Sequence, residues 1–222
     1  MASTSAMPIA QLLAANPYNP EILPDLEKHV DDQIANGTYD LDANLTLLRL
    51  YMFEPARVNV RKISGVLIKA MMALPRTDVT LCLCLIPERY QIEEPLSTLI
   101  ALSQFLETAR FREFWSEVEQ QRDLLGAVPG FTEAIQAYAL HVLAISHRRV
   151  PREILAEAIN MNGPALDDFI QRHVEASGWM VAPGKTGQVV ELPSNIEAQA
   201  ASRGLTESIP LDHVSRLFPV LS

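Results

Sequence analysis

The sequence predicts a mainly α-helical protein that ends in a module with a small β-hairpin. The first observation is a series of apolar residues at spacings of three and four, interrupted by prolines, up to about residue 125. The second is a pair of short β-prone runs, 179–181 and 189–192, on either side of a Gly/Pro-rich turn. A chain of 222 residues with 48% hydrophobic and 20% charged residues can bury such a core.

Capping residues and prolines mark the ends of the first helices. Asn19 can cap a helix whose first position is Pro20, where a missing N–H costs nothing, and Gly37 is suited to end that helix. Asp40 can cap the next helix, which must stop before Pro55. The apolar residues between these caps fall on one face of each predicted helix.

Four more helices are expected before the end of this region, at about 58–74, 77–86, 95–109 and 111–125. The helix at 77–86 is apolar on almost every side, which indicates a buried central element. Its Cys82 and Cys84 are interpreted as buried structural residues, because side chains two apart on a helix do not face each other. Stacked helices joined by short turns indicate a solenoid-like α domain.

The pattern changes after residues 126–130, which are interpreted as a hinge. Three helices are expected next, and the last of them ends at Ser177 with Gly178 in the C′ position. Three helices followed by a two-stranded wing is the order of a winged-helix module. A final helix is expected to present an apolar edge made of Leu211, Val214, Leu217 and Phe218. The predicted order is a flexible N-terminal segment, a helical domain, a winged-helix domain and a linker with the final helix, at 1–17, 18–126, 127–193 and 194–222.

Patterns that could carry catalytic or metal chemistry lack the partners that they need. The string Gly184-Lys185-Thr186 resembles the end of a phosphate-binding loop, but position 179, where that motif needs glycine, is Trp179. The five histidines show no metal-ligand spacing, and no Ser/His/Asp arrangement is visible. No active site, cofactor or metal is therefore expected. A membrane partner is not expected either, and two cysteines are typical of a reducing intracellular compartment.

The charge of the predicted winged helix disfavours contact with nucleic acid. Its expected reading helix, 165–177, has one basic and three acidic residues, a net charge of −2, and the whole chain carries −9. A basic cluster formed by Arg148, Arg149 and Arg152 precedes this helix. Two interpretations of the cluster stay open: surface charge that aids solubility, or a local contact with RNA or an acidic partner. A winged helix that binds protein is favoured, and no DNA partner is expected.

Several longer strings resemble the family of subunit k of eukaryotic translation initiation factor 3. They are densest between 18 and 115, and include Tyr18-Asn19-Pro20-Glu21, Tyr39-Asp40-Leu41-Asp42-Ala43-Asn44-Leu45, Leu50-Tyr51-Met52-Phe53-Glu54-Pro55 and Leu74-Pro75-Arg76-Thr77-Asp78. The resemblance implies a HEAT-like helical repeat domain followed by a winged-helix (PCI-like) domain. It also implies a non-catalytic scaffold subunit of that factor, which supports binding of the small ribosomal subunit and assembly of preinitiation complexes.

The same resemblance implies partners and contact residues. Other subunits of the factor, especially subunit l, and the small ribosomal subunit are the expected partners. The expected compartment is the cytoplasm, and the nucleus is left open. A docking edge on the wing strand and contacts in a shared helical bundle are assigned to Val189, Val190, Leu211, Val214, Leu217 and Phe218, although the chain's own core is an equally good place for them. Two other functions stay open: a scaffold subunit of the proteasome lid or signalosome, and a stand-alone RNA-binding winged-helix protein.

Overall fold

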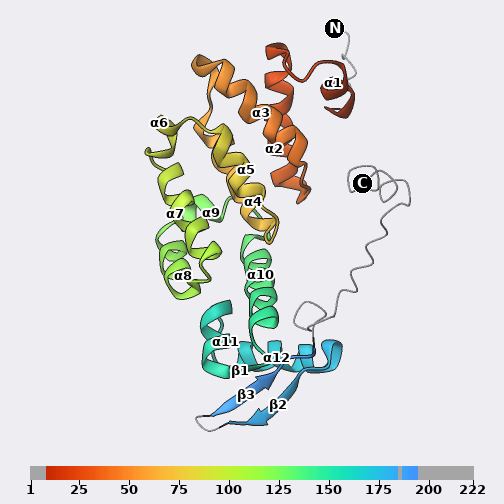
Figure 1. Ribbon diagram of the computed structural model, residues 1–222, viewed down its shortest axis with the longest axis vertical. Coiled ribbons are helices and arrows are strands. Elements are labelled where there is room, and N and C mark those ends of the chain that lie inside the picture. Colours follow the sequence, from red (N-terminus) through yellow and green to blue (C-terminus); the bar gives the residue numbers. More distant parts are fainter. Residues whose placement is uncertain (1–8, 185–186, 195–222) are drawn as a thin grey trace, which may run out of the picture.

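The computed structural model describes residues 9–184 and 187–194, and shows a helical stack with a small sheet at one end (Figure 1). Over these residues the α-helices are α1 (Ile9–Ala15), α2 (Leu23–Asn36), α3 (Leu41–Phe53), α4 (Val60–Met72), α5 (Asp78–Leu85), α6 (Glu88–Gln91), α7 (Leu96–Glu107), α8 (Phe111–Gln120), α9 (Arg122–Leu125), α10 (Phe131–Ser146), α11 (Arg152–Ile159) and α12 (Pro164–Ser177). The 3-10 turns are η1 (Pro20–Ile22) and η2 (Pro55–Arg57), and the strands are β1 (Arg149–Pro151), β2 (Met180–Pro183) and β3 (Gln188–Glu191). The predicted mainly helical class is confirmed.

The helix caps expected from the sequence are present. The Asn19 side chain accepts a hydrogen bond from the backbone N–H of Glu21, although Pro20 opens the 3-10 turn η1 and α2 begins three residues later. Gly37 ends α2 in the left-handed conformation, with φ of 68°. Asp40 then caps α3 by accepting a hydrogen bond at 3.2 Å from the N–H of Ala43.

Helix α4 is the central buried helix of the stack. Every residue from Ile63 to Met71 is buried, and α2, α5, α7 and α10 all pack against this helix. Helix α2 approaches most closely at Gly65, where a Cβ atom would lie 2.8 Å from the Cδ1 atom of Ile34. Lys69 is buried in the same helix, and this burial lowers the pKa of its ammonium group.

The expectation that the helix at 77–86 is the buried central element is wrong. Cys82 of α5 is buried, but Leu81 is 45% exposed and Cys84 is exposed. One side of α5 packs against α3 and α4, so the opposite side faces outward even though its residues are apolar. A helix that is apolar on all sides is therefore only half covered in this fold, and the prediction that both cysteines are buried fails at Cys84.

The helix expected over 111–125 is broken into two. Helix α8 stops before Gln121, whose φ and ψ of −109° and 28° are not helical, and α9 follows at once. The break turns Leu125 and the following Val128 into the hydrophobic core, where both are buried.

Helix α10 runs from the helical stack to the sheet-bearing end of the molecule (Figure 1). It packs against both α4 and α11. Phe131, Ile135, Ala139 and Leu143 form its buried stripe at spacings of four, and they belong to the same hydrophobic cluster as the residues of α4. The core is therefore continuous from the stack into the region around α11.

The C-terminal part of the described chain has the predicted winged-helix order, with one strand more than expected. The sheet is antiparallel in the order β1-β3-β2, and Val150 of β1 pairs with Val190 of β3. Strand β1 was not predicted, because three residues ending in a proline are too few to show alternation. Gly178 ends α12 in the left-handed conformation, with φ of 70°, as expected for the C′ position.

Candidate protein-interaction surfaces

The end of α11 is held by side chains from two other helices. The last carbonyls of a helix have no partner within it and need other donors. The indole N–H of Trp115 in α8 donates to the Ala158 carbonyl at 2.9 Å, and the Gln136 amide in α10 donates to the Ile159 carbonyl at 2.8 Å. Both bonds are buried: the first joins the helical stack to α11, and the second joins α10 and α11 within the winged helix.

A groove opens beside this joint, with a volume of about 1120 Å³. Its walls come from α8, α11, the start of α12 and the wing, which are far apart in the sequence. Apolar side chains on three of these walls are Trp115, Leu166 and Ile154, and Ile154 is 45% exposed although it is a large apolar residue. The groove is therefore larger than most small-molecule pockets and has one exposed apolar residue, Ile154, as an anchoring point.

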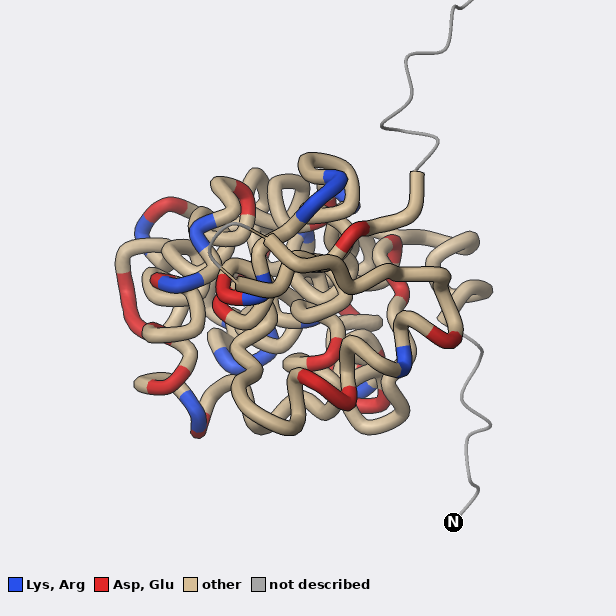
Figure 2. Tube along the Cα trace, turned by 90° about the horizontal axis from the view of Figure 1, so that it is seen from below, with Lys and Arg blue, Asp and Glu red and all other residues tan. Residues whose placement is uncertain are grey.

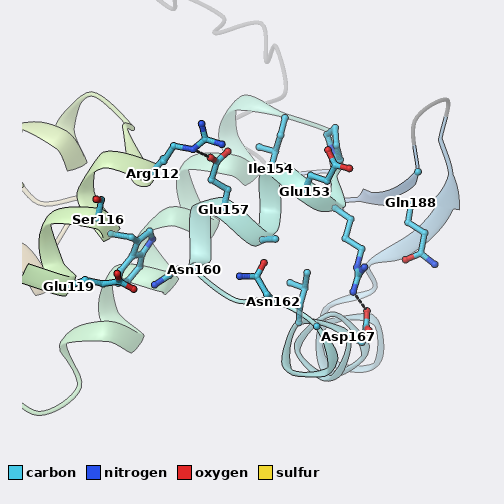
Figure 3. Close-up of a pocket in the computed structure, with 17 residues that line it drawn as sticks. Arg112, Ser116, Glu119, Glu153, Ile154, Glu157, Asn160, Asn162, Asp167 and Gln188 are labelled. Atoms are coloured by element: carbon cyan, nitrogen blue, oxygen red, sulfur yellow. Dashed lines mark hydrogen bonds and ion pairs between the residues drawn. The ribbon is translucent and has the colours of Figure 1, made fainter.

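Polar side chains surround these apolar residues (Figure 3). An ion pair joins Arg112 to Glu157, and the guanidinium of Arg152 donates to Asp167 at 2.6 Å. Figure 3 shows the amide of Asn162 between these two ion pairs. Within residues 9–184 and 187–194, five polar side chains that line the groove have neither a hydrogen bond nor an ion pair: Ser116, Glu153, Asn160, Asn162 and Gln188.

The predicted basic cluster is largely neutralised by the chain itself. The Arg149 guanidinium donates to the Glu191 carboxylate at 2.7 Å, and Arg152 is paired with Asp167 as described. Arg148 is exposed, and no described carboxylate pairs with its side chain. Figure 2, which looks onto the end of the molecule that bears the wing, shows Lys and Arg positions interspersed with Asp and Glu. A partner with phosphate groups would therefore meet paired rather than free arginines at two of the three positions.

The structure corrects the expected docking edge of the wing. Strand β3 lies between β1 and β2, so neither Val189 nor Val190 lies on a free edge of the sheet. Val190 is 1% exposed and belongs to the hydrophobic core, whereas Val189 is half-buried on the opposite face of the sheet. The outer strands of the sheet are β1 and β2, and on β2 Met180 is 62% and Val181 is 47% exposed. These two apolar residues on an edge strand form a candidate contact surface.

Aromatic stacking positions this edge strand. The Trp179 ring, just before β2, stacks on the His173 ring of α12 with a centroid distance of 4.4 Å and an interplanar angle of 16°. Phe169 packs against His173 with a centroid distance of 4.6 Å. Burial and the nearby Arg172 both lower the pKa of His173, because each disfavours the charged imidazolium.

Among the described residues, no group of three or more His, Cys, Asp or Glu side chains could hold a metal ion, and no described helix is long and apolar enough to cross a membrane. Burial, and to a lesser degree the Asp78 carboxylate, raises the pKa of the Cys82 thiol to about 12. The expected bundle contacts lie outside the described residues: Leu211, Val214, Leu217 and Phe218.

Sequence reasoning missed the two surfaces for different reasons. The groove is assembled from residues of α8, of α11 and α12, and of the wing, and no local pattern joins such distant segments. That β2 and not β3 is an outer strand depends on β1, which pairs with β3 and which the sequence did not reveal. The available signal was the pair Met180-Val181, because two adjacent large apolar residues on a strand of a small sheet cannot both face its core.

The fold defines the class of the protein, a HEAT-like helical stack followed by a winged-helix (PCI-like) module. The sequence profile of the CSN8/PSMD8/EIF3K family matches residues 58–201. Among curated relatives, "Eukaryotic translation initiation factor 3 subunit K" of Danio rerio is 35% identical over 90% of this chain and 88% of its own length. The human protein of that name is 34% identical with the same coverage, and that of Nematostella vectensis is 33% identical over 98% of both chains. The chain belongs to this family, in the branch of subunit K of eukaryotic translation initiation factor 3.

Proposed function

We propose that the chain acts as a non-catalytic scaffold subunit of eukaryotic translation initiation factor 3. In this role it binds other subunits and thereby supports binding of the factor to the small ribosomal subunit. Subunit l is its proposed direct neighbour, and the cytoplasm its proposed location. The names of the relatives, which describe a subunit of an initiation factor, support the membership and the non-catalytic role.

The observation that carries the proposal is the free edge of β2. Met180 and Val181 are exposed on a strand whose outer backbone groups pair with no other described strand. An exposed apolar edge strand is a hazard for a free monomer and a common contact for a partner that adds a strand or covers the edge. The stacked His173 and Trp179 rings hold the start of this strand in place, so the surface is ordered before a partner arrives.

A pull-down of the tagged full chain from cytoplasmic extract, with nuclease and increasing salt, tests the proposal. Recovery of the other subunits of the factor, with subunit l retained to the highest salt, is expected. Recovery of proteasome-lid or signalosome subunits instead would keep the fold and refute the function. Partners that nuclease removes would point to the RNA-binding alternative.

The edge strand can be tested in the same experiment. The double variant Met180→Lys with Val181→Lys places two charges on the β2 edge and should lower retention of the neighbouring subunit at least tenfold. Ile92→Lys is the matched control, because Ile92 is 74% exposed and lies outside the winged helix. Equal retention by both variants would show that the edge of β2 is not the contact.

A further inference from the structure

The groove beside the joint of α11 has features that the stability of this chain does not require. It is separate from the β2 edge, because it reaches the sheet at Pro151 of β1 and Gln188 of β3. We propose that this groove binds an extended segment of a partner protein that carries basic side chains around an apolar one. The proposal deepens the scaffold function and rests on it.

The charges that line the groove favour a basic occupant. Two arginines and four carboxylates lie on its walls, a net charge of −2: Arg112, Arg152, Glu119, Glu153, Glu157 and Asp167. Both arginines already pair with carboxylates of the groove. Glu119 keeps only a distant contact of 3.9 Å with Arg122, and Glu153 has no partner within the described part of the chain. The carboxylates that no arginine of the groove neutralises therefore make the groove negative, which attracts lysine or arginine and repels phosphate.

The side-chain amides favour a peptide in the extended conformation. Asn160, Asn162 and Gln188 have no hydrogen-bond partner among the described residues, and each amide can both donate and accept. An extended peptide presents N–H and C=O groups along its length, and these are the groups that such amides match. A helical segment would have used those groups internally.

The apolar residues of the groove supply an anchoring point. Ile154 is 45% exposed on α11, whereas Trp115 and Leu166 on the neighbouring walls are only 5% and 2% exposed. One apolar side chain of the occupant placed against Ile154 would bury area that is now in water. The groove volume of about 1120 Å³ exceeds the usual upper size of a small-molecule pocket, which fits a stretch of several residues.

The chain's own C-terminal part is a poorer match for the groove. Residues 195–222 contain three carboxylates and two arginines, so their net charge is −1. A segment of this charge is repelled by a negative groove. The occupant is therefore assigned to another protein of the assembly.

Site-specific cross-linking in the assembled complex tests the inference. The photoreactive residue p-benzoylphenylalanine replaces Ile154 in the tagged full chain, and cross-linked peptides are identified by mass spectrometry. The expected product joins position 154 to a segment of another subunit, and that segment has more lysine and arginine than acidic residues. The same residue placed at Ile92, outside the groove, is the control and should not capture that segment.

A charge reversal then tests the electrostatic argument. In the cross-linking chain, Glu119→Lys with Glu153→Lys should lower the yield of the product about tenfold, because two attractive contacts become repulsive. The matched control, Asp32→Lys with Glu93→Lys, adds the same charge at exposed positions outside the groove and should leave the yield unchanged. Equal loss in both variants would refute a specific basic occupant.

The outcomes separate this inference from the function on which it rests. If the wild-type chain recovers no subunit of the factor, the proposed function fails and the inference fails with it. The complex can assemble while position 154 captures no segment at all, or captures an acidic segment, RNA or residues 195–222 instead. In each of these cases the function stands and the inference alone is overturned. Capture of a basic segment at position 154, reduced only by reversal of the two groove glutamates, supports it.

Discussion

The joint between α8 and α11 makes a sharp prediction about stability. Trp115→Phe keeps an aromatic ring in place but removes the N–H that donates to the Ala158 carbonyl at 2.9 Å. Trp115 is buried, so the carbonyl loses its partner in a place that water reaches poorly. The loss should destabilise the folded chain by more than a change of ring size alone.

The expected size of the effect follows from two contributions. A buried carbonyl left without a donor costs about 1–3 kcal/mol. Replacing the indole by the smaller phenyl ring leaves unfilled space that costs roughly 1 kcal/mol more. The free energy of unfolding should therefore fall by about 2–4 kcal/mol. With a urea dependence of about 3 kcal/mol per M, the unfolding midpoint should fall by roughly 1 M.

Urea unfolding followed by far-ultraviolet circular dichroism measures this change. Gln136→Met is a companion variant, because it removes the donor to the neighbouring Ile159 carbonyl at 2.8 Å. Gln120→Met is the matched control, since Gln120 is exposed and its bond to Glu117 lies on the surface. A loss below about 0.5 kcal/mol in Trp115→Phe, or equal losses in the two glutamine variants, would refute the role assigned to these buried bonds.

Three further predictions concern single residues. The pKa of His173 is lowered in the folded chain, so the unfolded chain binds the proton more readily. The free energy of unfolding should therefore be constant above about pH 6.5, the usual pKa of histidine, and should fall as the pH drops below that value. The melting temperature of His173→Gln should depend less on pH between about 5.5 and 7.5 than that of the wild-type chain. The exposed Cys84 should react with iodoacetamide in the native protein, whereas the buried Cys82, whose pKa is raised to about 12, should react only after unfolding, as mass spectrometry can show. Asp40→Ala removes the cap of α3 and should lower the free energy of unfolding by about 1 kcal/mol, or the melting temperature by roughly 2–4 °C. Asp40→Asn should retain most of the wild-type stability, because asparagine also caps helices well.

Local chemistry explains the parts of the fold that the sequence predicted well. Caps act over three or four residues, so Asn19, Gly37, Asp40 and Gly178 could be placed without any knowledge of the tertiary structure. The wing hairpin was predicted for the same reason, because a Gly/Pro-rich turn between two β-prone runs is a local signal.

Tertiary packing explains what the sequence could not predict. The apolar composition of α5 indicated complete burial, yet Leu81 is exposed because the helices that cover α5 lie on its other side. The break at Gln121 has no proline or glycine to announce it, and it serves the burial of Leu125. Val190 proved to be a core residue because the unpredicted strand β1 occupies the edge beside it.

The positions of the two candidate surfaces allow the winged helix to contact two neighbours at once. The groove meets the sheet at β1 and at the start of β3, whereas the free apolar edge is β2, on the other side of β3. The bond from Trp115 of α8 to the Ala158 carbonyl of α11 joins the winged helix to the helical stack, and the bond from Gln136 to the Ile159 carbonyl joins α10 to α11. A rigid joint of this kind sets the angle between two bound partners, because neither surface can rotate without breaking a buried bond. The buried polar contacts at α11 therefore hold both candidate surfaces in a fixed position relative to the helical stack.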